Sequence, residues 1–209
     1  MSVYGSVAIL PGLNVSRETE ATMRRLVELV AKWTTHINLI SSKSLDDIWT
    51  RHILDSAQLF RYLPVGAKHW GDLGSGGGFP GLVIGIVALE LAPELRMTLI
   101  ESDQRKATFL RTAARELKLR VDVRTSRIEK TQPLVADILT ARALGPLPQL
   151  LSHAQRHLSA SGIGLFPKGR TADQEIAAAK QNWRFELTTH ASMTDVGAQI
   201  LRIEKIFHV

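Results

Sequence analysis

The feature that most constrains the fold of this chain is a glycine-rich loop between an expected strand and an expected helix. The loop covers residues 70–81 and has the sequence WGDLGSGGGFPG. The apolar residues before it indicate a strand, and Pro80 suits the first turn of a helix. Glycines let a backbone turn sharply and approach a ligand closely. Five of the eight residues from Gly74 to Gly81 are glycine, which is more than a structural turn needs, so the loop predicts a ligand-binding site.

From residue 67 onward, strand-like runs alternate with helix-like segments. The expected strands are His69–Leu73, Met97–Glu101, Val121–Thr125, Asp137–Ala141 and Ile163–Phe166. The expected helices are Pro80–Leu91, Gln104–Leu117, Leu147–Leu158 and Ala172–Gln181. Such alternation predicts an α/β fold around a mostly parallel sheet. Two further strands, Phe185–Thr189 and Gln199–Phe207, have no helix between them and predict a C-terminal antiparallel hairpin at the sheet edge.

Residues 1–65 are expected to form an N-terminal helical cap. Ser16 fits the N-cap of a first helix that runs to about Leu39. The segment Ser44–Asp47 resembles a capping box, which would begin a second helix that ends at Pro64. No linker separates these helices from the remainder of the chain. We therefore expect one structural unit, in which the cap packs on a ligand-binding domain of residues 66–209.

Two cofactors compete for a glycine loop of this kind. The dinucleotide pattern Gly-x-Gly-x-x-Gly fits only when it is counted from Gly76, and Pro80 then falls where the helix must offer N–H groups to a pyrophosphate. The frame Asp72-x-Gly74-x-Gly76-x-Gly78 instead resembles the first motif of class I methyltransferases, which have a Rossmann-like fold and bind S-adenosylmethionine. In that motif the carboxylate of Asp72 can hold the cationic amino group of the methionine moiety.

Further candidate ligands follow the next three strands. Glu101 ends the second strand, where a carboxylate can accept hydrogen bonds from both ribose hydroxyls of either cofactor. The loop after the third strand lies beside the adenine in a doubly wound sheet, so Ile128 can stack on the ring and Glu129 can meet the ring nitrogens. Arg142 follows the fourth strand, whose end faces the reacting methyl group, and is the expected catalytic-site residue that holds the cofactor or target in place.

The composition excludes several kinds of chemistry. The chain has no cysteine, which excludes disulfides, zinc–thiolate sites and the cysteine nucleophile of pyrimidine C5 methylation. We expect no metal. The longest apolar run, Gly81–Ala92, contains Glu90 and is too short to span a bilayer, and residues 1–15 have no basic segment of the kind that starts a secretory signal. We therefore expect a cytoplasmic protein without a membrane partner, and we separately expect it to be a monomer.

The positive charge of the chain is concentrated in one stretch. The net charge is +6, and residues 96–130 contain ten Lys or Arg against five Asp or Glu. A clustered basic surface suits a polyanionic partner such as RNA. A solvated helix face accounts for the charge equally well.

Several motifs together resemble one family. The runs Asn38–Ser41 and Arg51–Ser56, followed by the loop Asp72–Gly81, are similar to the glucose-inhibited division protein B family, the bacterial 16S ribosomal RNA guanine-N7 methyltransferases. The match continues through Lys106-x-x-Phe109-Leu110, Arg127-Ile128-Glu129, Arg142-Ala143 and Lys168-Gly169, and covers residues 15–170. The run Arg51–Ser56 with the Phe-Pro-Gly loop is specific, whereas the glycine loop alone indicates only a methyltransferase.

The resemblance implies an enzyme that methylates N7 of a guanine, with 16S ribosomal RNA or the small ribosomal subunit as its partner. It implies that S-adenosylmethionine contacts Gly74, Phe79, Ile128, Glu129 and Arg142. It also implies that the RNA-facing side carries Arg51, His52, Lys106 and Lys168. The family tends to have a basic residue after the glycine before its last strand, where this chain has Gly197-Ala198-Gln199, so no RNA contact is expected from the hairpin.

Other interpretations remain open at this stage. His52 lies on an apolar helix stripe, where a hydrogen-bonded core histidine is the commoner outcome. Arg51 and Asp55 are spaced four residues apart and can simply pair, and Lys168 can be an ordinary loop lysine. The chain can also be a methyltransferase of a small molecule or protein, or a catalytically silent RNA-binding module. Salt-insensitive turnover would favour the former, and failure to bind S-adenosylmethionine would favour the latter.

Overall fold

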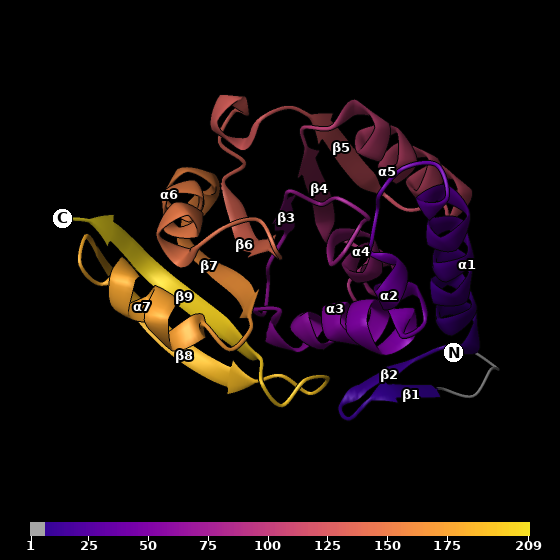
Figure 1. Cartoon of the computed structure of the whole chain (residues 1–209), viewed down its shortest axis with the longest axis horizontal. Coiled ribbons are helices and arrows are strands. Elements are labelled where there is room, and N and C mark those ends of the chain that lie inside the picture. Colours follow the sequence, from indigo (N-terminus) through magenta and orange to yellow (C-terminus); the bar gives the residue numbers. More distant parts are fainter. Residues whose placement is uncertain (1–6) are drawn as a thin grey trace.

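A seven-stranded sheet of order β5-β4-β3-β6-β7-β9-β8 forms the centre of the computed structural model, which describes residues 7–209 (Figure 1). The parallel strands are β3 (His69–Leu73), β4 (Arg96–Glu101), β5 (Val121–Thr125), β6 (Ala136–Ala141) and β7 (Leu158–Lys168). The C-terminal strands β8 (Trp183–Ala191) and β9 (Gln199–His208) pair antiparallel, and β9 also pairs antiparallel with β7. The predicted α/β class, the mostly parallel sheet and the hairpin at its edge are confirmed.

Helices cover both faces of the sheet, which explains why its strands are apolar on both sides. Helices α4 (Gly81–Leu91) and α5 (Gln104–Glu116) share one apolar cluster with residues of one sheet face. Helices α6 (Leu147–His157) and α7 (Ala172–Ala179) share a second cluster with residues of the other face. A short 3-10 turn, η3 (Ile128–Lys130), follows β5. Because the strands β3 to β7 are parallel, their carboxyl ends meet at one edge of the sheet. The loops that lead from these strands to the following helices lie at that edge.

The N-terminal helix α1 (Arg17–Thr34) packs beside α4 and α5, at the end of the molecule opposite the C-terminal hairpin (Figure 1). Ser16 is its N-cap as predicted, because the Ser16 hydroxyl accepts a hydrogen bond from the Thr19 backbone N–H at 3.2 Å. The Glu90 carboxylate at the end of α4 accepts from the Ser16 backbone N–H at 3.0 Å and from the Thr19 hydroxyl at 2.6 Å. These hydrogen bonds attach the start of α1 to α4, which covers one face of the sheet.

The predicted limits of the two N-terminal helices are wrong. The first helix ends at Thr34 instead of about Leu39. The second is a series of short turns, namely α2 (Ser42–Leu45), the π-helical η1 (Trp49–Leu54), α3 (Asp55–Ala57) and the 3-10 helix η2 (Gln58–Tyr62). Ser44 lies inside α2 and is no N-cap, and its hydroxyl instead bonds to that of Ser41 at 2.7 Å. A short hairpin of β1 (Val7–Leu10) and β2 (Leu13–Val15), which the sequence did not indicate, precedes α1.

The N-terminal segment shares its apolar core with the sheet. Met23 and Leu26 of α1 belong to the same buried cluster as Leu82 of α4 and Phe109 of α5. This shared core supports one structural unit, while a boundary at residue 65 stays a prediction. Residues 1–6 of the predicted cap lie outside the described residues. Between residues 7 and 209, none of the helices has the length and apolar character needed to cross a bilayer.

Candidate active site

The glycine loop turns back on itself at the carboxyl end of β3. Gly74, Gly76 and Gly78 have φ angles of +64°, +53° and +88°, in the left-handed region that favours glycine. A Cβ atom at Gly78 would lie 2.5 Å from Leu82 Cδ1, so this position also excludes a side chain on steric grounds. The carboxylate of Glu101 accepts a hydrogen bond from the Gly76 backbone N–H at 2.8 Å, which fixes the loop against the end of β4.

A cavity of about 360 Å³, here named the glycine-loop pocket, opens beside this loop. Six of the predicted site residues line it: Gly74, Gly76, Glu101, Lys106, Ile128 and Glu129. Its wall also contains Gln149 and His153 of α6, which sequence reasoning missed because an isolated polar residue on an amphipathic helix gives no signal. Lys106 was expected on the RNA-facing side; it lines this pocket, and its contact with RNA stays a prediction.

Asp72 lies behind the loop and lines neither of the pockets described here. Its side chain is completely buried, and its carboxylate accepts hydrogen bonds from the Gly81 backbone N–H at 3.2 Å and from the Thr140 hydroxyl at 2.8 Å. Burial raises the pKa of this carboxyl to about 6, although the hydrogen bonds and Arg142 act in the opposite direction. Asp72 therefore joins the glycine loop to β6, and its predicted contact with the methionine amino group stays a prediction.

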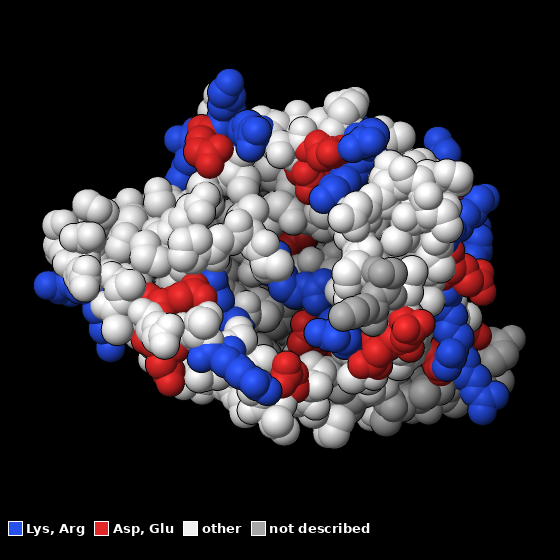
Figure 2. Space-filling model, in the orientation of Figure 1, with Lys and Arg blue, Asp and Glu red and all other residues white. Residues whose placement is uncertain are grey.

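A second and larger cavity, here named the Arg142 pocket, adjoins the first at Ala143. Its volume is about 990 Å³. The predicted residues Arg51, His52, Arg142 and Lys168 all line it. Figure 2 shows Lys and Arg atoms inside a central hollow of the molecule, with acidic side chains around it. The structure thus brings together three of the four residues predicted for RNA binding.

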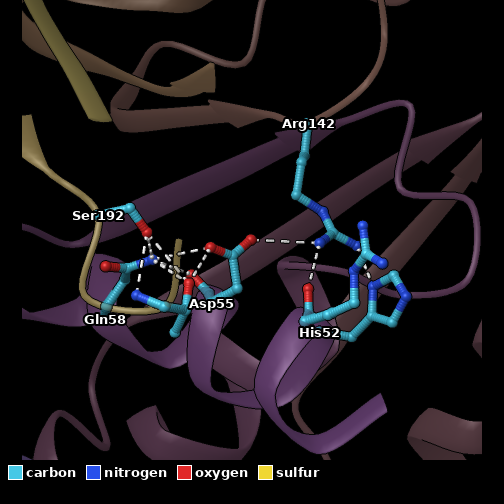
Figure 3. A network of polar contacts seen from close by, with 7 residues as sticks. His52, Asp55, Gln58, Arg142 and Ser192 are labelled. Atoms are coloured by element: carbon cyan, nitrogen blue, oxygen red, sulfur yellow. Dashed lines mark hydrogen bonds and ion pairs between the residues drawn. The ribbon is translucent and has the colours of Figure 1, made fainter. Parts of the chain in front are cut away.

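Arg142 is held by the N-terminal segment (Figure 3). Its guanidinium donates hydrogen bonds to the Arg51 carbonyl at 3.0 Å and to the His52 Nδ1 at 2.6 Å, and it forms an ion pair with Asp55 at 3.3 Å. The guanidinium carbon also lies 5.6 Å from the centre of the Phe79 ring. The π-helical segment, α3 and the glycine loop therefore define one orientation of the Arg142 guanidinium.

His52 is packed as the core-histidine alternative expects, and it also lines the Arg142 pocket, while its contact with RNA stays a prediction. Its ring stacks on Phe79 with the ring centres 4.8 Å apart, as a packed histidine would, and its Nδ1 faces Arg142. Burial, followed by the charges of Arg142 and Arg51, lowers the pKa of His52 to about 4. A neutral imidazole that accepts from Arg142 at Nδ1 carries its proton on Nε2. His52 is therefore poorly suited to act as a general base at neutral pH.

Asp55 connects Arg142 to the C-terminal turn, defined here as residues 192–198 between β8 and β9 (Figure 3). The Asp55 Oδ1 atom accepts hydrogen bonds from Gln58 Nε2 and from the Thr194 hydroxyl, both at 2.8 Å. The suggested pairing of Arg51 with Asp55 is wrong, because the π-helical winding breaks the four-residue register and Asp55 pairs with Arg142 instead. No sequence signal reveals a contact between residues 139 positions apart.

Lys168 lies in the Arg142 pocket with its charge already paired. Its ammonium donates to the Glu175 carboxylate and to the Gly145 carbonyl, both at 2.7 Å, and its side chain is only 10% exposed. Glu175 in turn accepts from the Leu147 backbone N–H at the start of α6. Lys168 thus fixes the loop after β6, whereas Arg51 is exposed. Among the described residues, Arg51 has no ion pair within 4 Å.

The model of the GidB family, described as rRNA small subunit methyltransferase G, matches residues 19–204. This chain belongs to that family. A ribosomal RNA small subunit methyltransferase G of Cereibacter sphaeroides is 52% identical over 202 residues, which are 97% of this chain and 98% of that protein. The protein of that name in Ruegeria sp. is 48% identical over 197 residues, or 94% of this chain and 96% of its own length.

Solved structures show the same fold at low sequence identity. The O-methyltransferase from Bacillus cereus in complex with SAH has a TM-score of 0.59 at 14% identity, with 88% of this chain and 91% of that chain covered. The mitomycin 7-O-methyltransferase MmcR has a TM-score of 0.60 at 15% identity, with 91% and 69% covered. The predicted family, the class I methyltransferase fold and S-adenosylmethionine as the cofactor are confirmed.

Proposed function

We propose that this chain transfers the methyl group of S-adenosylmethionine to N7 of a guanine in 16S ribosomal RNA. The observation that carries the proposal is the junction of the two cavities at Ala143. One cavity is built by the glycine loop and Glu101, and the other presents Arg51, His52 and Arg142. A cofactor in the first would lie beside a nucleotide in the second. The names of the relatives, which act on ribosomal RNA of the small subunit, support the same substrate.

The glycine-loop pocket has the hydrogen-bond acceptors that a nucleoside cofactor requires. Glu101 would accept hydrogen bonds from the ribose hydroxyls with the lone pairs that the Gly76 and Asp103 backbone N–H groups leave free. Ile128 and Glu129 would contact the adenine, and the methionine end would point toward Ala143. When bound, S-adenosylmethionine supplies an electrophilic methyl group on its sulfonium. Asp72 would favour the cationic amino group by its charge.

Guanine N7 fits the chemistry that this chain offers. The N7 atom has an in-plane lone pair and no proton, so neither a general base nor a covalent intermediate is needed. His52 is neutral with a pKa of about 4, and the chain has no cysteine. The segment Thr140-Ala141-Arg142 at the end of β6 also lacks the Asn/Asp-Pro-Pro motif that is typical of methylation of exocyclic amines. The protein would contribute orientation and the exclusion of water, which can be worth several kcal/mol.

Arg142 would serve to position the reactants. Methylation leaves a positive charge on the guanine ring, so a nearby guanidinium gains nothing from the charge that develops. Its fixed donors can instead hold the cofactor or the target base in line. Arg51 is the exposed cation beside it and would contact RNA phosphate. We further propose a cytoplasmic monomer that uses no metal and acts on 16S ribosomal RNA or on the small subunit.

The proposed activity is tested by incubating the protein with methyl-labelled S-adenosylmethionine and total ribosomal RNA from a methylation-deficient strain. After separation of the RNA species and digestion to nucleosides, we expect label only in 7-methylguanosine from 16S RNA. Turnover should fall steeply with salt, because phosphate contacts release counterions on binding. Label in 23S RNA or in another nucleoside would contradict the proposal, as would transfer to a small molecule that does not respond to salt.

A further inference from the structure

His153 of α6 is a buried polar residue in the wall of the glycine-loop pocket. It is 5% exposed, and its Nε2 atom has no hydrogen-bond partner among the residues that the structure describes. Gln149, one helical turn earlier, lines the same pocket. Buried polar atoms without a partner are rare in proteins, because they lose their bonds to water and gain none in return. The position and the missing partner together indicate a contact that forms when the pocket is filled.

A nearby carboxylate, that of Glu129, identifies the contact. The Glu129 Oε1 atom lies 3.7 Å from His153 Nε2, and the Glu129 side chain is 62% exposed and therefore able to move. A movement of roughly 0.7 Å would bring the two atoms to hydrogen-bond distance. Burial lowers the pKa of His153, so the ring is neutral at pH 7 and can donate a single N–H from Nε2.

The neighbouring histidine shows how α6 supports the loop after β5. His157 Nε2 donates to the Ile128 carbonyl at 3.1 Å, which fixes the backbone of the loop that carries Glu129. His153 lies one turn earlier on α6 and faces the carboxylate itself. The same helix thus contacts both the backbone and the side chain of the segment expected to meet the adenine.

We propose that His153 is a positioning residue that donates its Nε2–H to Glu129 and directs the carboxylate toward the exocyclic amino group of the adenine. The proposal rests on binding of S-adenosylmethionine in the glycine-loop pocket, as proposed above. A carboxylate accepts a hydrogen bond from the adenine amino group and repels the carbonyl oxygen that hypoxanthine has at the same position. The pair of His153 and Glu129 therefore makes the site selective for an adenine nucleoside.

The test compares two ligands by calorimetry, S-adenosylhomocysteine and S-inosylhomocysteine, which differ in this exocyclic group. We expect the wild-type protein to prefer the adenine ligand by about tenfold or more, the equivalent of one stranded polar group. Glu129→Ala should remove the preference. His153→Phe, which fills the volume without a donor, should reduce it by about threefold or more without weakening the binding of S-inosylhomocysteine, because Glu129 can then turn away from the carbonyl oxygen. His153→Gln, whose amide can still donate, should retain most of it.

Two controls separate positioning from packing. In a Glu129→Ala background, His153→Phe should have no further effect on the preference, because the two residues act as one unit. His190→Phe changes a histidine of β8 that also has an unpartnered Nε2 but lines neither pocket described above, and should leave the preference intact. Thermal unfolding verifies that each variant is folded.

The outcomes distinguish this inference from the proposed function. If His153→Phe keeps the full preference, or weakens both ligands equally, the positioning role is overturned while the cofactor site stands. Equal affinity of the wild-type protein for both ligands would overturn it as well. A wild-type protein that binds neither ligand would overturn the proposed function, and this inference with it.

Discussion

The guanidinium of Arg142 and the carboxylate of Asp55 form an ion pair at 3.3 Å that joins the end of β6 to the N-terminal segment. The two side chains are only 19% and 17% exposed, so removal of one partner leaves the other charge poorly solvated. The Thr194 hydroxyl and the Gln58 amide complete the hydrogen bonding of the carboxylate. Three parts of the chain that are far apart in sequence thus fix one cation beside the proposed reaction site.

Asp55→Asn should therefore reduce catalysis more than cofactor affinity. The amide keeps the shape of the side chain but loses the charge that holds Arg142, and we expect a loss of stability of about 1–3 kcal/mol. The single-turnover rate at saturating cofactor and RNA should fall by about tenfold or more. Asp46→Asn, at an exposed aspartate of the same segment, is the matched control. An unchanged rate for Asp55→Asn would show that the ion pair does not position Arg142.

Thr194→Val tests whether the C-terminal turn contributes to the site. The substitution removes the hydroxyl that donates to Asp55 at 2.8 Å and keeps the branched shape. We expect a lower rate of methyl transfer with little change in the dissociation constant of S-adenosylmethionine, while Thr194→Ser restores the rate. If Thr194→Ser is as slow as Thr194→Val, the effect comes from packing of the turn and not from the hydrogen bond.

Asp72 should make stability depend on pH in the opposite sense from most aspartates. Its folded-state pKa of about 6 exceeds the ordinary value of 3.8, so the folded protein binds this proton more tightly than the unfolded chain. Ionisation of Asp72 therefore lowers the free energy of unfolding. The full loss is present above about pH 6 and disappears as the pH falls toward 4. Asp72→Asn should be more stable than wild type at pH 7.5, by up to about 3 kcal/mol, and equally stable near pH 4.

Urea unfolding of both proteins across this pH range measures the effect. The amide that Asp72→Asn introduces can still accept from the Gly81 N–H and can donate to the Thr140 hydroxyl, so the packing is preserved. The same variant should bind S-adenosylmethionine more weakly if the charge serves the amino group of the ligand. A stability difference that does not change with pH would contradict the raised pKa of Asp72.

The rate of methyl transfer should be nearly independent of pH between about 7 and 8.5. Guanine N7 is already unprotonated there, and the pKa of His52 at about 4 lies well below this range. The single-turnover rate at saturating cofactor and RNA, measured for the wild type and for His52→Gln, is the test. A rate that rises along one ionisation, and loses that ionisation in His52→Gln without loss of binding, would identify a general base and exclude N7 as the target atom.

Arg51 and Lys168 should respond differently to removal of their charge. Arg51 is exposed, so Arg51→Ala should weaken RNA binding, leave cofactor affinity unchanged and reduce the slope of log affinity against log salt by about one. Lys168 is paired with Glu175 at 2.7 Å, so Lys168→Met should lower stability and leave the salt slope nearly unchanged. RNA titrations at several salt concentrations measure this slope for Arg51→Ala and for Lys168→Met. A reduced slope for Lys168→Met would assign that ammonium to a phosphate contact.

The sequence predicted most of the sheet and of the glycine-loop pocket because both follow from local patterns. Strands such as β3 and β5 are bounded by clear composition changes, and the carboxyl ends of parallel strands meet at one edge, which brings Glu101 and Ile128 to the glycine loop. The π-helical winding of Trp49–Leu54 could not be predicted, because apolar periodicity does not distinguish it from an α-helix.

The contacts made by side chains were harder to predict than the elements. The link between Thr194 and Asp55 joins distant segments through two short polar side chains, which leave no pattern in the sequence. The pairing of Lys168 with Glu175 depends on how α7 returns over the end of β7, so Lys168 looked like a free cation. His153 lies on the buried stripe of an amphipathic helix, where its place in a pocket wall has no local signature.

The most direct test of the account is chemical cleavage of 16S RNA after incubation with the protein and S-adenosylmethionine. Reduction followed by aniline treatment cuts RNA only where a guanine carries a methyl group at N7. We predict a single cleavage site with the wild-type protein, and none with an Arg142→Ala variant that remains folded. Methyl incorporation into 16S RNA without any cleavage would place the methyl group on another atom and contradict the account.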